Sequence, residues 1–156
     1  MNTRVKTYMK DAAGIVFYVN FPKANMFAPC LTFDGANSIM LKPGEKVYVL
    51  QNGSDSWAEK SVENGYNDNA LIYGKVTFDS AFEGYIKVPF TSLNSDWGWR
   101  PTLKGDNMSA LTSIALRFKG IGDDTEYGKE IIAGVTGYYT TDTARAEIGS
   151  VTKPEY

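Results

Sequence analysis

The feature that most constrains the fold is an alternation of apolar and polar residues with a period of two. In the segment GYIKVPF, Ile86 and Val88 alternate with Tyr85 and Lys87. Because successive side chains of a β-strand point to opposite faces, this pattern predicts a strand with one buried face. Further segments predicted as strands lie at 14–21, 29–34, 46–51, 57–63, 72–78, 113–118 and 130–140.

Turn signals separate these segments. Asn52-Gly53 and Asn64-Gly65 are each expected to close a hairpin, because both residue types tolerate positive φ. Lys42-Pro43-Gly44-Glu45 and the glycine-containing segments 105–107 and 122–124 are also typical of turns. Short strands with this turn spacing predict an all-β domain, a jelly-roll sandwich of two antiparallel sheets. Residues 1–156 are expected to form this one domain, with no helix longer than a few turns.

Charge and hydropathy exclude two classes of partner. The 16 basic residues are spread among 18 acidic ones, and the formal net charge is −2. A nucleic-acid-binding surface needs a dense Lys/Arg field, so no nucleic-acid partner is expected. The chain has no apolar run near the roughly 18 residues that a membrane-spanning helix needs. We therefore expect no membrane partner either.

The chain contains no histidine and a single cysteine. This excludes Ser-His-Asp and Cys-His catalysis, imidazole-bound zinc and an internal disulfide. Cys30 lies in an apolar segment and is interpreted as a small buried residue. Carboxylates remain as the acid–base groups. Residues 1–6 are basic without an apolar stretch behind them, so they do not resemble a signal peptide; a secreted parent would make this chain an excised module or a mature form.

The three tryptophans are the residues that a buried core explains least. Trp97 and Trp99 flank Gly98 in the polar segment 94–101, and Trp57 follows a turn. On an extended segment, positions i and i+2 face the same way about 6.8 Å apart. The alternative is that these rings anchor their loops to the core.

Exposed indole rings suit carbohydrate. One face of a β-linked pyranose carries axial C–H groups and packs on an aromatic ring, while its hydroxyls need planar polar partners. Such partners stand close to the tryptophans in the sequence. The predicted carbohydrate-binding residues are Trp57, Trp97, Trp99, Arg100, Asp96, Gln51, Asn67 and Tyr66, the last in a loop.

The run FEGYIKVPFTSL at 82–93 resembles a strand of bacterial carbohydrate-binding modules of the β-jelly-roll type. The likeness extends over most of residues 14–140, and the stretch 84–92 is its most specific part. It implies a secreted, bacterial, non-catalytic module, a monomer within a multi-modular enzyme of the cellulosome type that degrades plant cell walls. The implied ligand is a plant cell-wall polysaccharide. Because an extended β-1,4-linked chain presents flat pyranose faces that suit an open aromatic surface, we expect a β-1,4-linked glucan or a decorated glucan, such as xyloglucan or mixed-linkage β-glucan. The resemblance implies no cofactor except a structural calcium, for which Asp11 and Asp142 could serve.

Two other functions fit the same sequence. A small jelly-roll glycoside hydrolase would need two carboxylates about 5–9.5 Å apart. Glu59 and Glu63 would lie on one face of a single strand, but about 13 Å apart by strand rise, whereas Asp96 and Asp106 are expected in loops. The third interpretation is a structural or adhesive spacer with its tryptophans in the core. Exposure of the tryptophans separates the spacer from the glycan-binding module.

Overall fold

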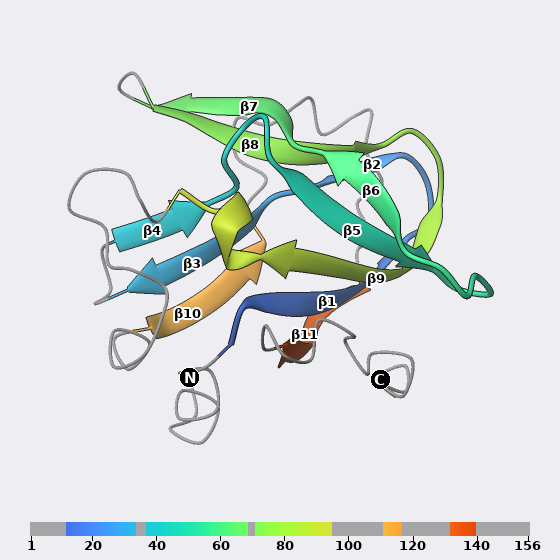
Figure 1. Ribbon diagram of the computed structural model, residues 1–156. Coiled ribbons are helices and arrows are strands. Elements are labelled where there is room, and N and C mark those ends of the chain that lie inside the picture. Colours follow the sequence, from blue (N-terminus) through green and yellow to red (C-terminus); the bar gives the residue numbers. More distant parts are fainter. Residues whose placement is uncertain (1–11, 34–36, 69–70, 95–110, 117–131, 140–156) are drawn as a thin grey trace.

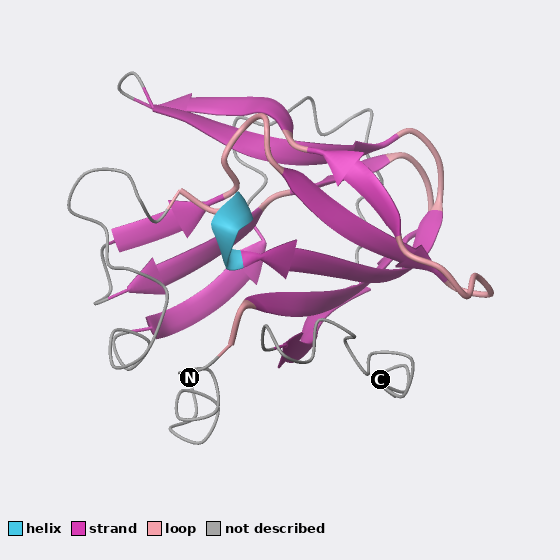
Figure 2. Ribbon diagram, viewed as in Figure 1, coloured by secondary structure: helices cyan, strands magenta, loops and turns pink. Residues whose placement is uncertain are grey.

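The computed structural model describes residues 12–33, 37–68, 71–94, 111–116 and 132–139, and these form an antiparallel all-β structure (Figures 1 and 2). Within them, η2 (Phe90–Ser92), a 3-10 turn, is the only helical element. The strands are β1 (Gly14–Phe21), β2 (Asn25–Phe27), β3 (Pro29–Phe33), β4 (Asn37–Met40), β5 (Lys46–Gln51), β6 (Ala58–Ser61), β7 (Glu63–Asp68), β8 (Leu71–Phe78), β9 (Phe82–Pro89), β10 (Leu111–Leu116) and β11 (Ile132–Tyr139).

The strands form one five-stranded and two three-stranded sheets. The five-stranded sheet has the order β11-β1-β9-β5-β6, and the smaller sheets have the orders β10-β3-β4 and β2-β8-β7. Only Ala28 separates β2 from β3, so one stretch of chain contributes a strand to each of the two small sheets. The backbone N–H of Gly74 on β8 donates to the Leu41 carbonyl just after β4, at 2.7 Å, which also ties these two sheets together.

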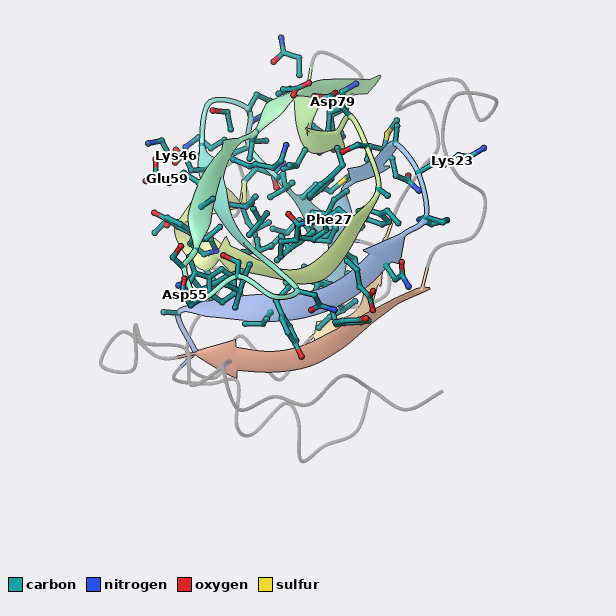
Figure 3. The ribbon with its side chains drawn as sticks, turned by 90° about the vertical axis from the view of Figure 1, so that its right-hand side faces the viewer. Lys23, Phe27, Lys46, Asp55, Glu59 and Asp79 are labelled. Carbon is teal, nitrogen blue, oxygen red and sulfur yellow. The ribbon has the colours of Figure 1, made fainter. Side chains whose placement is uncertain are left out.

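The main core fills the space between the five-stranded sheet and the two smaller ones. Ile15, Val49 and Ile86 contribute to it from the five-stranded sheet, and Phe27 and Val76 from the opposite side. Phe27 is fully buried and lies at the centre of the enclosed side chains in Figure 3. Its ring meets that of Phe17 edge-on, with 5.1 Å between centroids. Burial of this apolar surface supplies the main driving force for folding.

Most of the strands predicted from alternation are confirmed. β1 and β5 have the expected bounds, and β8 and β9 differ from the predicted ones by one or two residues at an end. The described parts of the segments predicted at 29–34, 113–118 and 130–140 are strands too. The inward row of β9 is confirmed as well, because Ile86 and Val88 lie in the core. The Pro43-Gly44 and Asn52-Gly53 turns are present, with φ of 88° at Gly44 and 86° at Gly53.

Two local predictions are wrong. The strand expected at 57–63 is interrupted at Val62, whose buried side chain packs in the core and whose backbone N–H donates to the Glu45 carbonyl. Asn64-Gly65 does not close a hairpin. It lies inside β7, where the register against β8 shifts between Asn64 and Tyr66, so Gly65 accompanies a bulge instead of a turn. β2, β4 and β7 were not predicted as strands. β2 and β4 are too short to show a clear alternation, and β7 contains the Asn64-Gly65 turn signal.

Gly84 allows β9 to lie against β5. A Cβ atom at this position would lie 2.1 Å from the Leu50 carbonyl oxygen and 2.9 Å from the Gln51 Cα. Both neighbours are backbone atoms of the paired strand, because Gln51 is directly opposite Gly84 in the register. Backbone held in a ladder cannot move aside without breaking strand pairing.

We expect Gly84→Ala to lower the free energy of unfolding by about 3 kcal/mol or more, the upper range for overpacking. The matched control is Gly44→Ala, where the new methyl group meets nothing within 4 Å and only the positive φ opposes it; its cost should be about 1 kcal/mol. Urea unfolding monitored by circular dichroism measures both. Equal losses in the two variants would contradict the close-approach argument.

Candidate carbohydrate-binding face

The outward face of the five-stranded sheet carries a second hydrophobic cluster. Val16 and Tyr18 of β1 and Tyr85 of β9 are buried there, and Leu50 and Trp57 pack against them with part of their surface exposed. We call these five residues the outer cluster. The Tyr18 and Tyr85 rings meet edge-on, 5.5 Å apart, and the Tyr18 hydroxyl donates to the Glu83 carboxylate. β1 and β9 therefore have packed side chains on both faces of the sheet.

The register places these residues in two rows across the sheet. Tyr18, Tyr85 and Leu50 are directly opposite one another on β1, β9 and β5. Lys87 on β9 is opposite Tyr48 on β5 in the neighbouring row. Directly opposite side chains on one face lie about 5 Å apart, so these residues form a continuous surface.

Lys87 lies next to two aromatic rings. Its Nζ atom is 4.8 Å from the centroid of the Trp57 ring and 5.2 Å from that of Tyr48. We call Tyr48, Trp57 and Lys87 the lysine–aromatic stack. An ammonium within about 6 Å of a ring centroid is attracted to the ring's negative face. All three side chains are half-buried, so they remain accessible from solvent.

Burial changes the ionisation of this surface. Removal from water lowers the pKa of the Lys87 ammonium and raises the pKa of the Tyr85 hydroxyl, because burial disfavours the charged form of each. Further along the same face, Lys46 donates to Glu59 at 2.5 Å, and this hydrogen bond, together with the attraction of the two charges, raises the pKa of Lys46. Figure 3 shows Lys46 and Glu59 side by side near the edge of the sheet.

The predicted binding residues are distributed over several parts of the chain. Trp57 belongs to the lysine–aromatic stack, whereas the exposed Gln51 follows Val49 on the inward side of β5. Tyr66 and Asn67 are on β7, in a different sheet from β5 and β6, so the prediction of a loop for Tyr66 is wrong. The cause is the Asn64-Gly65 pair, which continues the strand through a bulge. The other predicted binding residues, Asp96, Trp97, Trp99 and Arg100, and the calcium candidates Asp11 and Asp142, lie outside the described residues.

Sequence reasoning missed Tyr48 and Lys87 as site residues. The alternation at 84–90 identifies Lys87 only as a residue on the polar side of a half-buried strand. The signal that could have found them is the outward row of β5, Lys46-x-Tyr48-x-Leu50, facing Tyr85-x-Lys87 on β9. That signal becomes specific only when the register of the two strands is known.

The carboxylates considered for catalysis have structural partners. Glu59 pairs with Lys46, and Glu63 accepts a hydrogen bond from the Thr77 hydroxyl at 3.1 Å. They lie on different strands, β6 and β7, not on the single strand that was expected. Asp96 and Asp106 lie outside the described ranges. Cys30 is buried beside Met40 and Tyr73, as predicted for a small buried residue.

The described part of the chain contains neither a candidate metal site nor a membrane-spanning helix. No three His, Cys, Asp or Glu side chains gather there in a way that could hold a metal ion. None of its helical segments is long and apolar enough to cross a bilayer. In comparisons with known proteins, no family model matches the chain, and neither a curated protein nor a solved structure matches it.

The partial burial of Lys87 predicts that the stability of the fold depends on pH. Its folded-state pKa is below the ordinary value of 10.5, so in the window between the two values the unfolded chain binds more protons than the folded one. Stability of the wild type should therefore rise with pH in that window. Lys87→Met has no titrating group at this position, so its stability lacks this contribution to the pH dependence. We expect the stability of the wild type relative to Lys87→Met to increase as the pH rises toward 10.5, the ordinary pKa of a lysine. Urea unfolding of both proteins across this range measures it, and a constant difference would contradict the assignment.

Proposed function

We propose that this chain is a non-catalytic glycan-binding domain with a jelly-roll sandwich fold. Its ligand is a plant cell-wall polysaccharide with a β-1,4-linked backbone, such as a β-glucan or xyloglucan. The observation that carries the proposal is the position of Trp57. Its ring lies on the outward face of the five-stranded sheet, half-buried and outside the main core, beside Tyr48 and Lys87. In a spacer domain with purely structural tryptophans, we would expect this ring to be enclosed in the main core.

The chemistry of the lysine–aromatic stack suits an extended, neutral glycan. A β-1,4-linked chain presents flat pyranose faces, and the Trp57 and Tyr48 rings offer aromatic surface on which such faces pack. Lys87 has an ammonium with three N–H donors, the type of group that hydrogen-bonds to sugar hydroxyls. A coiled α-glucan would need a curved cradle, which a sheet face does not provide. We therefore assign the ligand to the β-linked class.

The rest of the predicted set extends this proposal. Trp97, Trp99, Asp96 and Arg100 stay predictions from the sequence, and we propose that at least one of the two tryptophans joins the binding surface. The resemblance of the run at 84–92 to jelly-roll modules supports a secreted bacterial protein in which this domain serves a larger wall-degrading enzyme. Gly84 lies in that run, and the close backbone of β5 leaves no room for a Cβ atom there.

A glycoside hydrolase is the second candidate, and the described carboxylates favour it less. Glu59 and Glu63 are each engaged with a neighbouring side chain on separate strands. A hydrolase needs two carboxyl groups facing one another across a bound sugar. The proposal therefore assigns binding alone to this chain.

We expect Trp57→Ala to weaken binding to β-glucan and xyloglucan by about 2 kcal/mol, because apolar contact area and an aromatic contact are both lost. Trp97→Ala and Trp99→Ala test the two predicted partners. Affinity electrophoresis and calorimetric titration measure the effect, after circular dichroism shows that each variant folds. Raised salt should barely change binding, since a neutral glycan forms no ion pair.

The matched control for Trp57 is Phe27→Leu, which alters an aromatic residue of the core and leaves the outer face intact. It should lower stability and keep affinity. Full affinity in all three tryptophan variants would refute the platform and favour the spacer interpretation.

Purified protein should release no reducing sugar from barley β-glucan, xylan or xyloglucan, because the proposed function uses no acid–base pair. A colorimetric reducing-end assay over a long incubation measures this. Sugar release that disappears in Glu59→Gln or Glu63→Gln would contradict the proposal and establish the hydrolase.

A further inference from the structure

A pocket of about 380 Å³ lies on the inward side of the β5–β6 hairpin, away from the lysine–aromatic stack. Its walls come from two turns at the same end of the molecule. One wall is the β5–β6 turn, including Gln51, Ser54 and Ser56, and the other is the β8–β9 turn, including Asp79 and Ala81. Both turns lie at the right of Figure 1, and Figure 3 views this end directly, with Asp79 labelled. We call this space the end pocket.

The floor of the end pocket is apolar and reaches the core. Two buried core residues line it, Val49 and Phe82, each 8% exposed, so a small part of the core surface forms the floor. The Phe82 ring lies 4.7 Å from that of Phe78, which also lines the pocket. Such a floor can receive an apolar molecular face of limited size.

The rim carries both hydrogen-bond donors and hydrogen-bond acceptors. Gln51, Ser54, Ser56, Asp79 and Ser80 are exposed around the opening and supply amide, hydroxyl and carboxylate groups. Lys60 adds an ammonium. Its Nζ lies 4.8 Å above the Phe78 ring and donates to the Thr77 carbonyl at 2.7 Å, so two contacts hold it in place. One ammonium and one carboxylate on the rim balance one another, which favours an uncharged ligand.

We propose that the end pocket binds a single terminal sugar ring of a neutral glycan. A pyranose matches both halves of the pocket, since it has an apolar C–H face and a rim of hydroxyls that donate and accept. The volume is near the lower end of the roughly 300–1,000 Å³ typical of small-molecule sites, which suits a chain end better than a long segment. Because the pocket and the lysine–aromatic stack share no lining residue, this inference stands or falls separately from the proposed function.

The experiment titrates the full chain, labelled with ¹⁵N, with methyl β-glucoside, methyl β-xyloside, methyl β-galactoside and cellobiose. We expect amide shifts in the two turns that form the walls, with affinity for at least one probe of roughly millimolar strength. Ala81→Trp places a large ring in the opening and should weaken binding roughly tenfold or more. The matched control, Thr91→Trp, adds the same ring at an exposed position near the opposite end of β9 and should leave affinity unchanged. Ser80→Phe is a second blocking variant in case Ala81→Trp does not fold.

The outcomes separate the two sites. Trp57→Ala should leave binding of the small probes intact, and Ala81→Trp should leave most polysaccharide retention intact. Loss of polysaccharide retention in Trp57→Ala with no pocket shifts for any probe would overturn the end-pocket inference alone. Pocket shifts with unchanged retention in Trp57→Ala would leave the pocket in place and overturn the lysine–aromatic platform. Binding that collapses in raised salt would also overturn the assignment to a neutral sugar.

Discussion

The pairing of β9 with β1 on one side and β5 on the other is the interaction on which the rest of the structure depends. β9 is the middle strand of the five-stranded sheet, and it pairs with β1 along its whole length. Its inward residues Ile86 and Val88 contribute to the core, while its outward residues Tyr85 and Lys87 build the outer face. The turn that leads into it forms one wall of the end pocket. One strand therefore sets the position of the core and of both candidate sites.

The β5–β6 hairpin separates two kinds of surface. Neighbouring residues of an extended chain point to opposite sides, so Trp57 reaches the outward face while Ser56 and Ala58 line the end pocket. The hairpin is fixed by its pairing from Lys46 to Val49 and by the Lys46–Glu59 ion pair at its base. Because that pair is exposed, it contributes little to stability, and the strand ladder does most of the positioning.

The sequence predicts the strands well where both faces have distinct chemistry and poorly where local signals compete. In β5, the buried Val47 and Val49 alternate with more exposed residues, Lys46, Tyr48 and Leu50, and the predicted bounds agree with the structure. In β7, Asn64-Gly65 carries the chemistry of a turn, yet pairing with β8 keeps the chain extended through a bulge. Trp57 could be selected from sequence because it follows a turn, whereas Lys87 could not. Its proximity to Trp57 depends on a register between β9 and β5 that no local pattern specifies.

The lysine–aromatic stack also determines how a sugar can approach the proposed site. An ammonium 4.8 Å from the Trp57 centroid covers part of one indole face, so a pyranose must pack on what remains exposed. The same ammonium is partly removed from water, which lowers its pKa and leaves fewer water molecules to displace when it donates to a hydroxyl. Fixing the lysine on two rings also reduces the side-chain entropy that a binding partner would otherwise have to overcome. In this arrangement the Trp57 and Tyr48 rings orient the Lys87 ammonium and also offer a surface on which a sugar packs. Discrimination among neutral glycans would then depend on where their hydroxyls lie relative to Lys87.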